Sequence, residues 1–120
     1  MVYLLSMKSI DQMIHLDKLA VVHESAEIGD NCTIGPFCTV GENVTIGANT
    51  VLRSHVVVEA NTSIGEDCDI FPFVTIGIQS QDNKYVPGTI TYTQVGNRCI
   101  VREFVSIHSG TEEASTTSVG

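Results

Sequence analysis

Few side chains in this sequence could do chemistry. Histidine is the usual general base in proteins, and the chain contains four histidines and four cysteines. A third candidate is the segment Gln81–Tyr85, which brings an amide, a carboxylate and an ammonium group close together. Its composition alone is typical of a solvated turn, because Asp and Asn favour such positions. What these groups do depends on the elements that position them.

A six-residue repeat organises most of the chain. Ten consecutive positions spaced six apart are all Val, Ile or Leu: Val22, Ile28, Ile34, Val40, Ile46, Leu52, Val58, Ile64, Ile70 and Ile76. A period of six fits neither an amphipathic helix nor an alternating strand. It is typical of hexapeptide repeats, in which each short strand forms one side of a triangular prism. We therefore predict an all-β solenoid of parallel strands, whose stacked coils lie about 4.8 Å apart.

A second inward position accompanies the aliphatic one. The fourth residue after each aliphatic is small or slender, at Ala26, Cys32, Cys38, Val44, Thr50, Val56, Thr62, Cys68 and Val74. One large and one small inward residue per strand lets a narrow tube fill without voids. All four cysteines, including Cys99, take this small position, and none has the CxxC or metal-ligand spacing. We predict buried, reduced thiols, which suit a cytoplasmic protein.

The repeat register also divides the chain, whose length supports one domain. Residues 1–15 are predicted to be an N-terminal extension or cap, and residues 16–120 the hexapeptide-repeat β-helix. Polar stretches at 78–94 and 112–118 interrupt the register and are predicted to be loops. A further hexad opens at Val119–Gly120, and no polar cap for the last repeat is present. Because an uncovered repeat exposes strand edges, we expect the chain to be truncated at its C-terminal end, as part of a longer protein.

Charge and hydropathy argue against several classes of partner. The formal net charge is -8, with no cluster of Lys or Arg, which disfavours nucleic acid and anionic membrane surfaces. No apolar stretch approaches the ~20 residues of a membrane span. The apolar start, Met1–Leu5, lacks the basic flank and cleavage site of a signal peptide.

Two histidines, His23 and His55, raise the question of a metal site between neighbouring coils. A metal needs three or four convergent ligands. His23 holds the second place of its hexad and His55 the fourth, so they leave the prism at different corner positions. We therefore predict no metal site and place both histidines on the surface or at a subunit contact.

Four segments carry a family resemblance through their order and separation: Cys32–Cys38, Val51–Val58, Gln81–Tyr85 and Ile100–Thr111. Together they resemble the N-terminal part of the acyl-[acyl-carrier-protein]–UDP-N-acetylglucosamine O-acyltransferases of lipid A biosynthesis. Single hexads are shared by many acyltransferases, whereas the QDNKY loop followed by the VREFVSIHSGT segment is more specific. The resemblance implies a left-handed parallel β-helix and a homotrimer with active sites between subunits. It also implies transfer of a 3-hydroxyacyl group from acyl carrier protein to the 3-hydroxyl of UDP-N-acetylglucosamine, without a cofactor.

The same resemblance assigns substrate-binding roles to Gln81, Asp82, Lys84 and His108. Asp82 matches an aspartate associated with substrate hydroxyls, and Lys84 a lysine whose ammonium suits a diphosphate. Gln81 supplies an uncharged donor and acceptor, and His108 matches a histidine that lines the cleft. The family's catalytic histidine lies beyond Gly120, so we predict no catalytic residue in this chain and no activity for it alone.

Two departures and two alternatives remain open. Ser109 stands where many family members have Arg, and Asn83 replaces an aliphatic residue, so contacts at both positions are in doubt. One alternative is another hexapeptide-repeat enzyme, such as the related N-acyltransferase or a carbonic-anhydrase-like protein. The other is a non-catalytic trimeric β-helix scaffold.

Overall fold

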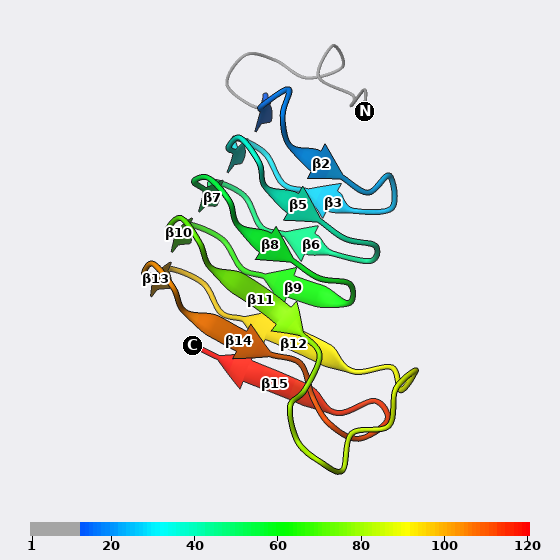
Figure 1. The fold of residues 1–120 in the computed structure, drawn as a ribbon. Coiled ribbons are helices and arrows are strands. Elements are labelled where there is room, and N and C mark those ends of the chain that lie inside the picture. Colours follow the sequence, from blue (N-terminus) through cyan, green and yellow to red (C-terminus); the bar gives the residue numbers. More distant parts are fainter. Residues whose placement is uncertain (1–12) are drawn as a thin grey trace.

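The structure, a computed structural model, describes residues 13–120 as a stack of short parallel strands (Figure 1). Sheet A contains β1 (His15–Leu16), β4 (Thr33–Ile34), β7 (Val51–Leu52), β10 (Asp69–Ile70) and β13 (Ile100–Val101). Sheet B contains β2 (Val21–Val22), β5 (Thr39–Val40), β8 (Val57–Val58), β11 (Thr75–Ile78) and β14 (Ser106–His108). Sheet C contains β3 (Glu27–Ile28), β6 (Thr45–Ile46), β9 (Thr62–Ile64), β12 (Tyr92–Val95) and β15 (Thr116–Val119).

Strands follow one another around the three sheets in the fixed order A, B, C. Each strand pairs in parallel with the strand one coil later, as in Thr33 beside Val51 and Ile34 beside Leu52. The predicted all-β, left-handed parallel β-helix is confirmed. No helix with the length and apolar character to cross a membrane occurs among residues 13–120.

The predicted core is also confirmed. The ten repeating aliphatic residues are all buried, and so are the nine small residues at the second inward position, from Ala26 to Val74. Each strand therefore contributes one face to a continuous aliphatic interior, which the hydrophobic effect holds together. The molecule's function must lie on its corners and outer faces, because the interior is filled.

Three corners join the sheets. The AB corner consists of residues 17–20, 35–38, 53–56, 71–74 and 102–105, and the CA corner of 29–32, 47–50, 65–68 and 96–99. The BC corner consists of residues 23–26, 41–44, 59–61, 79–91 and 109–115. Most turns contain one residue in the left-handed region, such as Asn31, with φ 59°, or Phe37, with φ 62°. This conformation costs an L-residue about 1–2 kcal/mol, and Asn and Asp tolerate it best.

The buried thiols are part of the corner architecture. The thiol of Cys32 donates to the Gly47 carbonyl at 2.9 Å and that of Cys68 to the Gly96 carbonyl at 3.1 Å. Burial raises the pKa of the Cys32, Cys38 and Cys68 thiols, so all three stay protonated and unreactive. The prediction was wrong for Cys99, which is half-exposed because its coil is the last of those that the structure describes.

The strands extend further than the sequence indicated. Ile78 belongs to β11 and Tyr92–Gln94 to β12, so the first loop spans 79–91 rather than 78–94. Thr116–Ser118 belong to β15, which places the second loop at 109–115 rather than 112–118. Ile14 is already buried and β1 begins at His15, so the solenoid starts before residue 16. The rest of the proposed N-terminal extension, residues 1–12, lies outside the described residues.

The end of the first loop was misjudged because the first inward residue of β12, Thr93, is polar. Thr93 is buried between its neighbours on β9 and β15, with Thr62 on one side and Thr117 on the other. A strand whose inward residue is threonine does not stand out in a pattern of aliphatic residues.

Candidate functional site

The candidate site is the BC corner, where the loop 79–91 leaves the prism between β11 and β12 (Figure 1). Three of the four predicted site residues, Gln81, Asp82 and Lys84, lie on this loop, and all three are exposed. The fourth, His108, lies at the end of β14 and is half-buried, beside Ile78 of β11. The fold therefore brings all four residues to one corner of the solenoid.

Hydrogen bonds within the loop fix the orientation of Asp82. Its carboxylate Oδ1 accepts the backbone N–H of Lys84 at 2.8 Å, and its carbonyl accepts the N–H of Tyr85 at 3.0 Å. Its own N–H donates to Ser80 Oγ at 3.1 Å. This Asx turn leaves the second carboxylate oxygen of Asp82 free to accept from a ligand.

The ends of the loop are tied to the loop below it. Ser80 Oγ lies 2.8 Å from Thr111 Oγ1, and Thr91 Oγ1 lies 2.6 Å from Ser109 Oγ in a buried pair. The backbone N–H of Ser109 also donates to the Ile78 carbonyl at 2.7 Å. Ser109, which departs from the resemblance described above, is thus buried and anchors the base of the loop.

A cavity of about 380 Å³ lies between the loop and the prism wall. It is lined by Glu59, Ala60, Asn61, Gly77, Ile78, Gln79, Tyr85, Thr89, Thr91 and Ser109. Two of these residues are joined by a hydrogen bond from the Tyr85 hydroxyl to the Thr89 carbonyl at 3.3 Å. The cavity is small and mostly polar, so it can hold part of a hydrophilic ligand while the exposed loop residues contact the rest.

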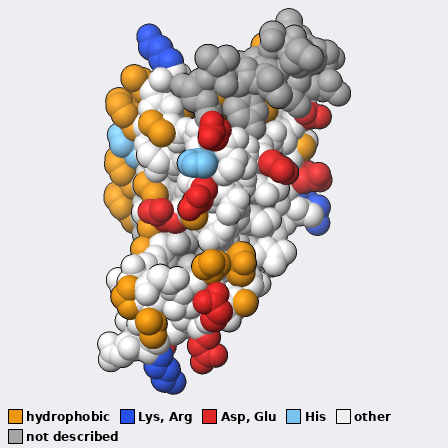
Figure 2. All heavy atoms as spheres, turned by 90° about the vertical axis from the view of Figure 1, so that its right-hand side faces the viewer, with side chains coloured by type: hydrophobic (Ala, Val, Ile, Leu, Met, Phe, Trp, Pro, Cys, Tyr) orange, Lys and Arg blue, Asp and Glu red, His pale blue; other side chains and the backbone are white. Residues whose placement is uncertain are grey.

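Lys84 is the single Lys or Arg on the BC corner within residues 13–120. The two ion pairs of the described chain join Arg53 to Asp69 and Arg102 to Glu103 instead. Carboxylates predominate near Lys84, and Figure 2 shows acidic side chains scattered over this side of the molecule. The Lys84 ammonium is therefore available to an anionic ligand. Within residues 13–120 it is the one Lys or Arg side chain on this corner that could attract such a ligand.

The remaining histidines stand apart from the loop. His23 Nδ1 lies 2.8 Å from Ser25 Oγ, and the His55 ring is stacked between Phe37 and Phe73 with centroid separations of 5.0 and 4.9 Å. Within residues 13–120, no three His, Cys, Asp or Glu side chains converge as a metal site requires. None of the described histidines is hydrogen-bonded to Gln81, Asp82 or Lys84.

Sequence reasoning missed the residues that hold the loop in place. Ser80, Thr91 and Thr111 bond across the two loops, yet Ser and Thr are common in any polar connection. The signal that could have found them is their position, since each lies within a few residues of a strand end. To predict which hydroxyls pair between the two loops, one must know the register of β11 with β14. The periodicity alone did not give that register.

Comparison with known proteins shows which proteins the chain is similar to. The family profile described as bacterial transferase hexapeptide (six repeats) matches residues 12–42 and 25–60. The acyl-[acyl-carrier-protein]–UDP-N-acetylglucosamine O-acyltransferase of Chlamydia pneumoniae is 36% identical over 70 residues, covering 58% of this chain and 25% of the relative.

Solved structures extend the similarity over most of the chain. The Francisella novicida UDP-N-acetylglucosamine acyltransferase is 48% identical with a TM-score of 0.84, covering 90% of this chain and 39% of that one. The Moraxella catarrhalis UDP-N-acetylglucosamine O-acyltransferase is 47% identical with a TM-score of 0.77, covering 80% of this chain and 37% of that one.

The chain thus spans about a quarter of the length of the curated relative and about two fifths of the solved structures. The chain is a hexapeptide-repeat protein and, over part of their length, a homologue of the UDP-N-acetylglucosamine acyltransferases.

Proposed function

We propose that this chain is the segment of an acyltransferase that presents the substrate-binding loop. The reaction moves a 3-hydroxyacyl group from acyl carrier protein to the 3-hydroxyl of UDP-N-acetylglucosamine, the first step of lipid A biosynthesis, in the cytoplasm. The observation that carries the proposal is the anchored loop 79–91, which holds Gln81, Asp82 and Lys84 exposed at the BC corner. The similarity to solved acyltransferases supports the same activity.

Asp82 binds the sugar. One carboxylate oxygen is occupied by the N–H of Lys84, so the other is left to accept from a sugar hydroxyl, in an orientation that the Asx turn sets before the ligand arrives. An acceptor that is already oriented loses less entropy on binding than a mobile one. Gln81, on the same exposed turn, adds an uncharged donor and acceptor for a neighbouring hydroxyl or amide.

Lys84 binds the diphosphate. Its ammonium has no ion-pair partner within residues 13–120, so it is available to an anionic group. His108 lies below the loop at the end of β14. Its backbone is paired with Ile78 and its side chain is half-buried, so it can line the substrate cleft beside the loop.

Acyl transfer also needs a base. The attacking sugar hydroxyl must lose its proton as its oxygen bonds to the thioester carbon, and the thiol of the carrier then leaves. His55 is held between two rings and His23 is bonded to Ser25, so neither is placed for this role. We propose that the base lies outside this chain and that the 120-residue chain alone does not turn over. A homotrimer, in which a neighbouring subunit completes the cleft, is part of the same proposal.

The test is a titration of the isotopically labelled chain with UDP-N-acetylglucosamine, followed by NMR. We expect saturable shifts at Asp82, Lys84 and His108. Asp82→Asn should weaken binding by about tenfold, since a hydrogen bond to a charged group contributes roughly 1.5–3 kcal/mol. Asp67→Asn is the matched control, because Asp67 is exposed at the CA corner with φ 57°, a conformation that Asn accepts.

Two results would count against the proposal. Shifts that are absent, or unchanged by Asp82→Asn, would favour the scaffold alternative. Turnover of acyl carrier protein and UDP-N-acetylglucosamine by the purified chain would contradict the placement of the base outside it.

A further inference from the structure

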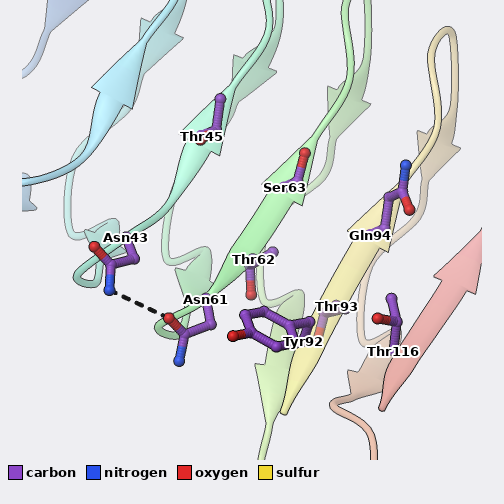
Figure 3. A pocket seen from close by; sticks show the side chains of 9 residues that line it. All are labelled: Asn43, Thr45, Asn61, Thr62, Ser63, Tyr92, Thr93, Gln94 and Thr116. Atoms are coloured by element: carbon purple, nitrogen blue, oxygen red, sulfur yellow. Dashed lines mark hydrogen bonds between the residues drawn. The ribbon is translucent and has the colours of Figure 1, made fainter. Parts of the chain in front are cut away.

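A second hollow lies on the outer face of sheet C, away from the loop residues that the proposed function uses. Its volume is about 450 Å³, and strands β6, β9, β12 and β15 form its floor. It is lined by Asn43, Thr45, Asn61, Thr62, Ser63, Tyr92, Thr93, Gln94 and Thr116 (Figure 3). We call these nine residues the sheet C groove.

The lining of the groove is entirely uncharged. All nine residues are Asn, Gln, Ser, Thr or Tyr, on a chain with fourteen acidic residues and a net charge of -8. A neutral polar lining offers no counter-ion to an anion or a cation, whereas it matches a neutral ligand that carries many hydroxyl or amide groups.

Most of the outward polar groups of the groove have no protein partner. One side-chain hydrogen bond joins two of its residues, from Asn43 Nδ2 to Asn61 Oδ1 at 3.3 Å. Within the described residues, the Ser63 and Tyr92 hydroxyls and the Gln94 amide make no hydrogen bond. An amide and two hydroxyls on the adjacent strands β9 and β12 are therefore available together, on a rigid sheet whose strands repeat at about 4.8 Å.

One aromatic ring lies among these polar groups. Tyr92 begins β12 and is 41% exposed, and Figure 3 shows its ring extending toward Asn61. An exposed ring beside amides can pack against the C–H face of a sugar while the amides bond to its hydroxyls, because tyrosine combines an apolar face with a polar tip.

From these observations we infer that the sheet C groove is a binding site for a neutral saccharide. Tyr92 forms the platform, and Asn61, Ser63 and Gln94 provide the hydrogen bonds. The site is distinct from the loop, although Asn61 lines both hollows. The groove would bind an uncharged sugar unit that carries no phosphate. The loop site differs in this respect, because Lys84 there is proposed to bind a diphosphate.

The test is a titration of the labelled 120-residue chain with the uncharged disaccharide N,N′-diacetylchitobiose. We expect saturable shifts at Ser63, Tyr92 and Gln94. Tyr92→Ala should weaken binding by about tenfold or more through loss of the platform, while Tyr92→Phe should retain most of it. Thr39→Ala is the matched control, because Thr39 is an exposed hydroxyl residue on sheet B and its loss should change nothing.

Gln94→Ala provides a second variant in case Tyr92→Ala does not fold, since Gln94 is exposed and its removal leaves no cavity. Asp82→Asn should leave disaccharide binding intact, so failure of the loop site would be recognised separately. The inference is overturned if the disaccharide gives no saturable shift or binds Tyr92→Ala equally well. It is also overturned if sedimentation shows that sheet C is covered by a second copy of the chain that the disaccharide does not displace.

Discussion

The AB and BC corners of this prism are built from the same hexad but have opposite characters. Every turn of the AB corner has four residues, and its left-handed positions carry Phe37, His55, Phe73 and Phe104. Their rings stack along the solenoid with centroid separations of 5.0, 4.9 and 5.7 Å. The BC corner instead carries Asn43 and Asn61 at these positions and then opens into two loops. Figure 2 shows hydrophobic side chains, with a histidine among them, along one edge of the molecule.

Charges follow the same division. At the AB corner Arg53 binds Asp69 through two hydrogen bonds of 2.9 and 2.8 Å, and the guanidinium lowers the pKa of that carboxyl. Arg53 and Arg102 also lie over the Phe71 ring, at 3.9 and 4.4 Å from its centroid. The two arginines of the AB corner are thus paired with carboxylates, while the BC corner leaves Lys84 and one oxygen of Asp82 unpaired within the described residues. One corner can therefore be specialised for stability and another for binding within a single repeat.

The largest expected difference between the corners comes from their glycines. Gly35 at the AB corner is buried, and an added Cβ would collide with the Arg53 carbonyl of the next coil. Gly35→Ala should lower the free energy of unfolding by more than about 3 kcal/mol, because backbone must move to admit the methyl group. Gly88 in the BC loop has φ 92° and nothing within 4 Å of its would-be Cβ. Gly88→Ala should cost only about 1 kcal/mol of backbone strain.

Urea unfolding of both variants checks this prediction, with the slope of the transition as a control for a change in the unfolded state. Equal losses of stability would mean that the AB corner is no more rigid than the BC loop, and the comparison would fail.

The sequence predicted the two corners unequally. The period of six and its small second position specified the sheets and the core, because burial of Ile34 or Cys32 leaves a strong pattern in the residue types. The resemblance marked Gln81, Asp82 and Lys84, and the fold places them together with His108. The aromatic stack escaped prediction because Phe37 and His55 are eighteen residues apart and differ in type. The two rings are close because one coil of the solenoid is eighteen residues long. Both residues have left-handed backbone, but this conformation cannot be recognised from the residue types Phe and His.

A second prediction concerns the buried pair at the base of the loop. Ser109→Ala leaves Thr91 Oγ1 buried without its partner, which should cost about 1–3 kcal/mol. Adding Thr91→Val should recover part of that loss, since both polar groups are then absent. The double-mutant cycle should give a coupling of at least about 0.5 kcal/mol.

The matched control for this cycle is the exposed pair on sheet B. Thr75 Oγ1 donates to Ser106 Oγ at 3.0 Å, where water can replace either partner. Thr75→Val and Ser106→Ala should therefore be additive. Additivity at Thr91 and Ser109 as well would show that the loop is not anchored by this contact.

The smallest expected effect tests the aromatic stack itself. Phe73 lies between His55 and Phe104, and each stacked pair contributes roughly 0.5–1.5 kcal/mol. It also holds φ 64°, which Asn tolerates better than Ala or Phe. Phe73→Ala loses the stacking and keeps the strain, so it should cost about 2 kcal/mol. Phe73→Asn loses the same stacking but relieves part of the strain, and should cost about 1 kcal/mol.

Asn49→Ala at the CA corner separates the two contributions. Asn49 has φ 62° and stacks on no ring, so its replacement reports the backbone preference alone, at about 1 kcal/mol or less. If thermal unfolding shows that Phe73→Asn is as stable as the parent chain, the rings add nothing beyond filling a left-handed turn. The AB corner would then differ from the BC corner only in lacking insertions, because its aromatic residues would be interchangeable with the asparagines found at the other corners.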